Sequence, residues 1–144
     1  MATIADLEVK QIESHLIAGG YLAAFTDILG NPQPAPIFQP FELNLTDQLS
    51  DSRIVMIRTT GSVTSATRVF FKSVPIVIIV VGQAVQNDSI IANGLAIDME
   101  KYLVDSYGDG ACLANIESSG VTGPFILPDG RRVFEINMQA MFNI

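Results

Sequence analysis

The chain has 144 residues and carries eight Lys and Arg against fifteen Asp and Glu, which gives a formal net charge of −7. Nucleic-acid binding through phosphates needs a basic surface, so this charge argues against a conventional DNA- or RNA-binding protein. The length fits a single substantial core, and we therefore expect one domain over residues 1–144 rather than two.

Something other than charge must cover part of the surface. Charged residues make up only 16% of the chain and hydrophobic residues 49%, whereas an average soluble domain has about 25% charged residues. Burial between identical subunits would remove apolar surface from water, because obligate homo-oligomer interfaces are more apolar than ordinary surface. A β-rich monomer with a large core is the alternative.

The cysteine count and the longest apolar run bear on the compartment. Cys112 is the only cysteine and no signal-peptide pattern opens the sequence, so we expect synthesis in a reducing cytoplasm. The run VPIVIIVVG, Val74–Gly82, is less than half of the roughly 20 residues that a membrane-spanning helix needs, so we expect no contact with a membrane. Its β-branched residues instead predict a strand that is buried on both faces.

The first part of the chain predicts a helix and then an extended segment. The helix is expected from Thr3 to about Ala24, with Gly19 and Gly20 ending it or loosening its last turn. Its apolar stripe consists of Ala5, Val9, Ile12, Leu16 and Ala23. Four of the seven prolines follow in Gly30–Phe41, which predicts an extended, Pro-rich segment over residues 30–41 that serves as a rigid connector or as an arm on a neighbour.

Three consecutive β segments are expected next. They are Arg53–Thr60, Thr67–Lys72 and Val74–Gly82, and their order suggests an antiparallel meander. A second helix is then expected from Asp88 or Ser89 to Tyr107, with Asp88 or Asn87 as its N-cap.

The second helix has two apolar surfaces. Its broad face consists of Ile91, Leu95, Met99, Tyr102 and Leu103, and one such face suffices to cover a sheet. A separate stripe, spaced seven residues apart, consists of Ile90, Ile97 and Val104. This stripe needs another partner, either the first helix or a neighbouring subunit.

The last strand alternates between apolar and amide side chains. A strand at Ala111–Ser118 is expected to lead, through a wide connection with Asp129 and Gly130 in its turn, into a final strand that closes a hairpin. The even positions of that strand, from Phe134 to Ile144, are apolar. The odd positions are largely uncharged and polar, and the residues we assign to a lumen or partner face are Asn137, Gln139 and Asn143. We expect this face to look into an assembly rather than into bulk water.

Arg131 and Arg132 begin the final strand, where adjacent side chains point to opposite faces. They either keep the end of the hairpin soluble, with an ion pair to Asp129 or Glu135 that contributes little, or contact a neighbouring subunit or a passing phosphate backbone. Arginine is enriched at interfaces, so we assign both to a subunit contact.

Residues with catalytic or ligating chemistry are few. His15 lies away from the apolar stripe of the first helix and is expected to be solvated or to contact a cap, and Cys112 is expected to be a small core residue. The chain has no phosphate-binding glycine motif and no nucleophile elbow. We therefore predict no catalytic residues, no cofactor and no metal site.

The order of these parts resembles the tail terminator proteins of long-tailed bacteriophages, also called minor tail or tail-completion proteins. The resemblance covers most of residues 53–144 and is clearest in DGRRVFEINMQ, Asp129–Gln139, because that family often has a Gly-Arg turn followed by a phenylalanine-containing strand with alternating Asn. The long Pro-rich segment and the uniformly apolar Val74–Val81 depart from the family pattern.

The resemblance implies an α+β fold with a mixed, mainly antiparallel sheet that carries two helices on one face. It also implies a virion protein, made in the bacterial cytoplasm, that forms a homo-oligomeric ring of six copies. The ring would cap the tail tube, stop polymerisation of the tube protein and join the tail to the head-completion or connector proteins. DNA would pass through its lumen without specific binding.

Alternatives remain within and outside this class. A tail tube or head-tail connector subunit of related fold would share these features, and a small cytoplasmic enzyme or ligand-binding domain is the alternative of another class. If a ring forms, we expect Ile90, Ile97 and Val104 and the exposed strand edges to close it, because cyclic symmetry removes a sheet's open edges.

Overall fold

The apolar run at Val74–Gly82 forms the middle strand of the fold. The computed structural model describes residues 4–40, 52–59, 71–84, 88–106 and 113–143, and in it the run belongs to β5 (Phe71–Val81). Its even residues, such as Ile78, contribute to a core under the helices, and its odd residues, such as Ile79, contribute to a second apolar cluster on the opposite face. The prediction of a strand buried on both faces is therefore confirmed.

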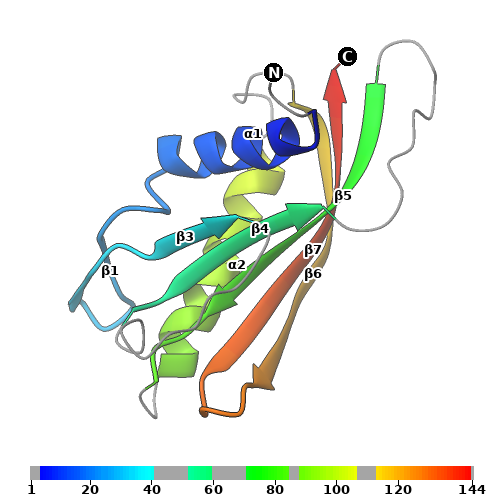
Figure 1. Ribbon diagram of the computed structural model, residues 1–144. Coiled ribbons are helices and arrows are strands. Elements are labelled where there is room, and N and C mark those ends of the chain that lie inside the picture. The colour runs from blue at the N-terminus through cyan, green and yellow to red at the C-terminus, as the bar shows by residue number, and fades with distance from the viewer. Residues whose placement is uncertain (1–3, 41–51, 60–70, 85–87, 107–112, 144) are drawn as a thin grey trace.

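Four further strands flank β5 in one mixed sheet with the order β3-β4-β5-β7-β6 (Figure 1). These strands are β3 (Ile37–Pro40), β4 (Ile54–Thr59), β6 (Leu113–Ile126) and β7 (Arg132–Asn143). Among the strands that the structure describes, only β3 and β4 pair in parallel. The expected separate strand at Thr67–Lys72 is corrected in part, because Phe71 and Lys72 continue into β5. Residues 67–70 lie outside the described ranges.

Two helices, α1 (Ile4–Ala18) and α2 (Asp88–Ser106), cover one face of this sheet. Their buried residues meet the inward side chains of the strands in one core. The helical members include Val9, Ile12, Leu16, Leu95, Met99 and Leu103, and the members from β7 are Phe134, Ile136, Met138, Ala140 and Phe142. The α+β fold, with a mainly antiparallel sheet and two helices on one face, is confirmed.

The first helix ends earlier than expected, at Ala18 instead of near Ala24. Gly20 has a φ of 84°, its N–H donates to the Ile17 carbonyl, and the Tyr21 N–H donates to the Leu16 carbonyl. This pair of bonds is a Schellman motif, which closes a helix at a glycine in the left-handed region. Ala23, expected on the apolar stripe, is therefore exposed beyond the helix.

The Pro-rich segment contains two structural features that its composition did not predict. Its first part contributes β2 (Pro32–Gln33), which pairs with the preceding β1 (Phe25–Thr26) in a small hairpin. Its second part contributes β3 to the edge of the large sheet, where a proline lacking its N–H is tolerated. The segment is extended as expected, but it belongs to the fold of its own chain.

The final hairpin is longer and tighter than predicted. The strand expected at Ala111–Ser118 extends to Ile126, so only the loop from Leu127 to Arg131 joins β6 to β7. Gly130 in this loop has a φ of 88°, which confirms its turn role. Three irregularities interrupt the pairing of β6 with β7, and the last lies between Thr122 and Phe125. We predicted a loop at GVTGP because Gly and Pro are common in turns. Glycine is also common in β-bulges, which is what this stretch forms.

Gly123 in the last bulge is a direct test of this geometry. Its φ is 138°, and a Cβ there would lie 2.7 Å from the Val133 carbonyl oxygen. We expect Gly123→Ala to lower the free energy of unfolding by about 1–3 kcal/mol in urea denaturation. The control is Gly94→Ala in α2, where a Cβ meets nothing within 4 Å and should add about 0.5–1 kcal/mol. Equal stability of Gly123→Ala and wild type would contradict the bulge.

Candidate functional site

The stripe predicted on the second helix is only partly exposed. Ile90 is 65% exposed and Ile97 is 46% exposed, whereas Val104 is partly buried and packs against the core. Residues spaced seven apart drift by about 20° per step around a helix, so the stripe turns toward the sheet as it approaches Val104. The two isoleucines therefore form the available part of the stripe.

These isoleucines border an apolar groove of about 380 Å³ between α2 and the segment from Gly20 to Ile28. Tyr21, Phe25 and Leu95 are among its less exposed lining residues. Ile28, at the tip of the β1–β2 hairpin, lines the same groove and is 84% exposed. The groove thus has exposed isoleucines on two sides, one side from a helix and one from a hairpin.

The charged residues that line the groove are acidic. They are Asp27, on the hairpin, and Asp98, which is exposed on α2 beside Ile97. Burial, with a smaller contribution from the Asp98 carboxylate, raises the pKa of the Tyr21 hydroxyl above its ordinary value of 10.0. The groove therefore presents apolar surface and negative charge, which suits a partner with apolar side chains next to a cation.

A buried ion pair holds the groove's two sides together. The Arg53 guanidinium, just before β4, meets the Asp88 carboxylate at the first residue of α2, and both side chains are almost fully buried. Arg53 Nε donates to Asp88 Oδ2 over 3.1 Å, and the same carboxylate oxygen accepts the Gln83 N–H over 2.6 Å. A carboxylate at a helix N-terminus is also favoured by the helix dipole. Asp88, expected only as a cap, is therefore a structural anchor.

The same arginine reaches the hairpin. Arg53 Nη1 donates to Gln33 Oε1 over 2.9 Å, and its guanidinium lies 5.6 Å from the centre of the Phe25 ring. Gln33 Nε2 in turn donates to Asp27 Oδ2 over 2.8 Å. The hairpin is thereby fixed to the start of β4 and to the N-terminus of α2, which sets the width of the groove.

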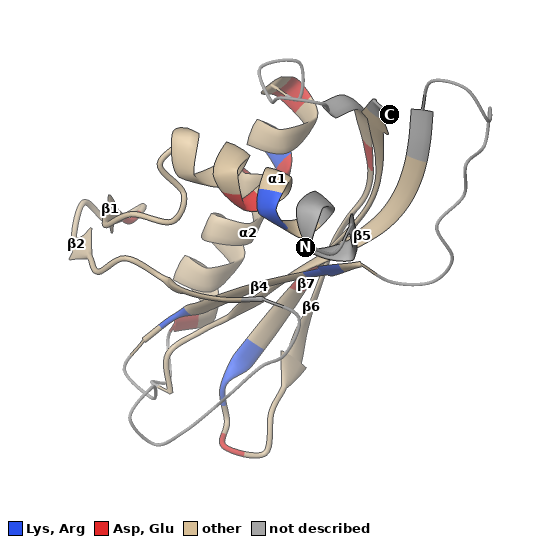
Figure 2. Cartoon of the chain, turned by 45° about the horizontal axis from the view of Figure 1, so that its top comes forward, with Lys and Arg blue, Asp and Glu red and all other residues tan. Residues whose placement is uncertain are grey.

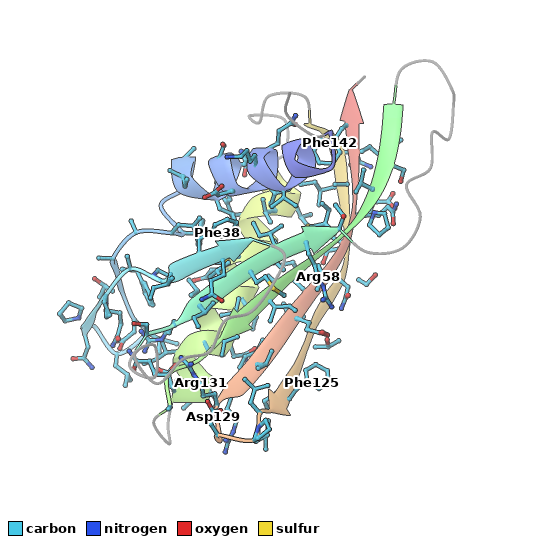
Figure 3. All side chains as sticks on the ribbon, in the orientation of Figure 1. Phe38, Arg58, Phe125, Asp129, Arg131 and Phe142 are labelled. Carbon is cyan, nitrogen blue, oxygen red and sulfur yellow. The ribbon has the colours of Figure 1, made fainter. Side chains whose placement is uncertain are left out.

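Arg131 is a buried residue and does not belong to the subunit interface that we predicted for it. It is 1% exposed, its Nε donates to the Gly82 carbonyl over 2.8 Å, and a terminal nitrogen donates to the Ser52 carbonyl. Figure 3 shows it at the start of β7, close to Asp129 in the turn. Its guanidinium ties the ends of β5 and β4 to β7, so the expectation of a subunit contact is corrected.

Arg132, Asn137 and Gln139 are partly exposed and can still contact a partner. Arg132 is half-buried and one of its terminal nitrogens donates to the Gly130 carbonyl. Asn137 and Gln139 are half-buried on the helix-free face of the sheet, where Gln139 Nε2 donates to Ser73 Oγ over 2.6 Å. Asn143 ends β7, and its side chain lies outside the described part of the structure. Figure 2 shows how few charged residues colour the sheet.

His15 is not solvated, which corrects the expectation for this residue. It is buried, stacks on the Tyr102 ring with 4.9 Å between ring centres, and has Nε2 3.4 Å from Ser106 Oγ. It lies three residues after Ile12, so it borders the buried stripe and turns toward α2. Cys112 lies outside the described residues.

The described ranges contain no candidate metal centre and no helix suited to span a membrane. There, no three His, Cys, Asp or Glu side chains gather closely enough to hold a metal ion. Neither α1 nor α2 combines the length and the apolar character that crossing a bilayer would require.

Comparison with known proteins adds no relative. No family model matches the chain, and no curated protein matches it.

The Arg53–Asp88 pair predicts a large stability difference between single and double variants. Arg53→Met leaves the Asp88 carboxylate buried without its cation, and breaking a buried pair in this way costs about 3–5 kcal/mol. The double variant Arg53→Met with Asp88→Leu should recover most of that loss, because it removes both buried charges. Urea denaturation of the three proteins measures this, and a double variant less stable than the single one would contradict the pairing.

The hairpin gives a prediction about pH. The Asn31 N–H and the other donors to the Asp27 carboxylate lower its pKa below the ordinary 3.8. A lowered pKa stabilises the folded hairpin above 3.8, and this stabilisation is lost as the pH falls through the folded value. An NMR titration should find the Asp27 pKa below 3.8, and Gln33→Leu should raise it partway. A wild-type pKa at or above 3.8 would contradict the hydrogen-bond network.

Proposed function

We propose that this protein is a structural subunit that works by self-assembly, in the manner of the tail terminator proteins it resembles. A homo-oligomeric ring, of six copies on the family pattern, would cap a bacteriophage tail tube and stop its polymerisation. The ring would also form the joint to the head-completion or connector proteins. Its place would be the virion tail, after synthesis in the bacterial cytoplasm, and it would need no catalysis and no cofactor.

The observation that carries this proposal is the groove beside α2. Single exposed apolar side chains are normal on the surface of a soluble protein. Ile28, Ile90 and Ile97, in contrast, are exposed together around one groove. Exposing several aliphatic side chains around one hollow is costly in water, and a neighbouring subunit would bury them. Burial of apolar surface contributes about 25 cal/mol of free energy per Å², so covering the groove with a neighbouring subunit favours assembly.

The helix-free face of the sheet supports a lumen or partner role for Asn137 and Gln139. Both are half-buried amides, and amides can hydrogen-bond to another protein without attracting a phosphate backbone strongly. The net charge of −7 acts in the same direction, because repulsion keeps DNA that passes through a channel from adhering.

The capping mechanism follows from asymmetry between the two faces of a ring. A closed cyclic ring leaves one face to match the tube and the other face to match a different partner. Growth stops if the far face cannot recruit another tube subunit, which is a matter of specificity and not of chemistry.

Two alternatives remain with distinct signatures. A tail tube or connector subunit would use the same groove to build longer assemblies. A small enzyme or ligand-binding domain would use the groove for an apolar ligand, since about 380 Å³ lies within the usual size range of ligand pockets.

Electron microscopy and light scattering of the purified protein test the proposal. We expect closed rings with a central hole for wild type, and a smaller species for Ile97→Asp, because a carboxylate in the groove would have to be buried on assembly. Ile17→Asp is the matched control, since Ile17 is 57% exposed on α1 away from the groove. Long tubes would favour the tube subunit, and monomers that bind an apolar probe would favour the ligand-binding domain.

A further inference from the structure

A second exposed apolar feature lies at the end of β6. Phe125 is 50% exposed and Ile126 is 65% exposed, and Figure 3 shows Phe125 beside the turn into β7. Adjacent strand residues point to opposite faces, so this strand end is apolar on both sides. The bulge between Thr122 and Phe125 redirects the strand immediately before the pair, as bulges commonly do.

A cation accompanies this strand end. Ile126 pairs with Arg132 across the hairpin, and directly paired residues share one face of a sheet. The strand end therefore carries an isoleucine and an arginine on one side and a phenylalanine on the other. We use "wedge" for Phe125, Ile126 and Arg132.

The groove has apolar sides and an acidic residue, which complement the wedge. It has exposed isoleucines on two sides, Ile90 and Ile97 from α2 and Ile28 from the hairpin, and Asp98 lines it beside Ile97. A slot with two apolar sides fits an inserted element that is apolar on both faces. The acidic residue of the groove and the basic residue of the wedge complement each other in charge.

The wedge lies at the β6 edge of the sheet, and none of its three residues lines the groove of its own chain. β6 is one edge strand of the sheet, and the β1–β2 hairpin that borders the groove leads into β3, the other edge strand (Figure 1). The wedge and the hairpin side of the groove therefore belong to different surfaces of one chain, with α2 packed over β6 and β7 between them. A contact between two different surfaces of identical chains is heterologous, and it builds a ring when its rotation closes.

We propose, on the basis of the assembly function above, that the subunits join head to tail by inserting the wedge of one copy into the groove of the next. In this contact Phe125 and Ile126 face the two apolar sides of the groove, and Arg132 pairs with Asp98 of the neighbouring copy.

Two other ways of pairing copies are less favourable. Groove against groove would bring the Asp27 and Asp98 carboxylates of both copies together, and like charges at an interface are unfavourable. Direct backbone pairing along β6 meets three irregularities of register and Pro124 near the strand end, and such features block edge-to-edge pairing.

Mixing two variants tests the insertion. Ile97→Asp damages the groove and keeps the wedge, whereas Ile126→Asp damages the wedge and keeps the groove. We expect each variant alone to be monomeric in analytical ultracentrifugation, and an equimolar mixture to give a one-to-one heterodimer, because only one of its possible contacts is intact. Circular dichroism checks the fold of each variant, and Phe125→Ser replaces Ile126→Asp if that variant does not fold.

Each outcome of this experiment supports or contradicts the insertion, the proposed function or both. Heterodimers support the insertion. A mixture that stays monomeric, or a variant that alone still assembles like wild type, overturns the insertion while wild-type rings keep the proposed function. Wild type that stays monomeric even at about 1 mM, the weak end of useful affinity, overturns both.

A charge exchange provides an independent readout. Asp98→Arg and Arg132→Asp each place like charges together and should weaken assembly at least about ten-fold. The chain with both changes restores opposite charges across every contact and should assemble more strongly than either single variant. A double variant no better than the weaker single one would overturn the pairing of Arg132 with Asp98.

Discussion

The guanidinium of Arg53 and the carboxylate of Asp88 meet inside the protein where three segments converge. Arg53 immediately precedes β4, Asp88 opens α2, and Gln33 of the hairpin accepts a further bond from the same arginine. A buried pair of this kind does not guarantee stability, but removing one partner is costly, so the three segments are obliged to stay together. The groove exists because this contact sets the hairpin beside the helix.

Because the chain carries little charge, apolar and amide side chains cover much of its surface. β5 is apolar on both faces, and the helices cover one of them. The opposite face carries a second apolar cluster and then half-buried amides along β7. Among the described residues, most exposed large apolar side chains lie at two places, the groove with the adjoining hairpin tip and the end of β6, and Ile17 on α1 is the exception. These two places have opposite charge beside them, which is the basis for a directional contact between copies.

Periodicity predicted the elements that depend on local pattern. The alternation along β7 gave its buried residues, including Ile136 and Phe142, because a strand with one core face repeats every second residue. The three-and-four spacing gave α2, and the apolar run gave the doubly buried β5. The parallel pairing of β3, in contrast, depends on contacts with β4 that no local pattern in a Pro-rich segment reveals.

The polar residues were the least predictable. His15, Arg53 and Arg131 are all buried, although residues of these types are mostly exposed or intermediate in proteins. Their burial depends on partners distant in sequence: Tyr102 for His15, Asp88 for Arg53 and the Gly82 carbonyl for Arg131. Asp88 was visible as a helix-start residue, but no sequence signal connected it with Arg53. For the candidate interface, Ile90 and Ile97 are exposed and Arg132 is half-buried, whereas Val104 packs against the core and Arg131 is buried.

The most direct measurement is an electron cryo-microscopy map of the assembled protein. We expect a closed ring in which Ile90 and Ile97 of every copy are covered by the end of β6 from the next copy. A ring that leaves the groove open to solvent, or a lone subunit with a small molecule bound between α2 and the hairpin, would contradict it.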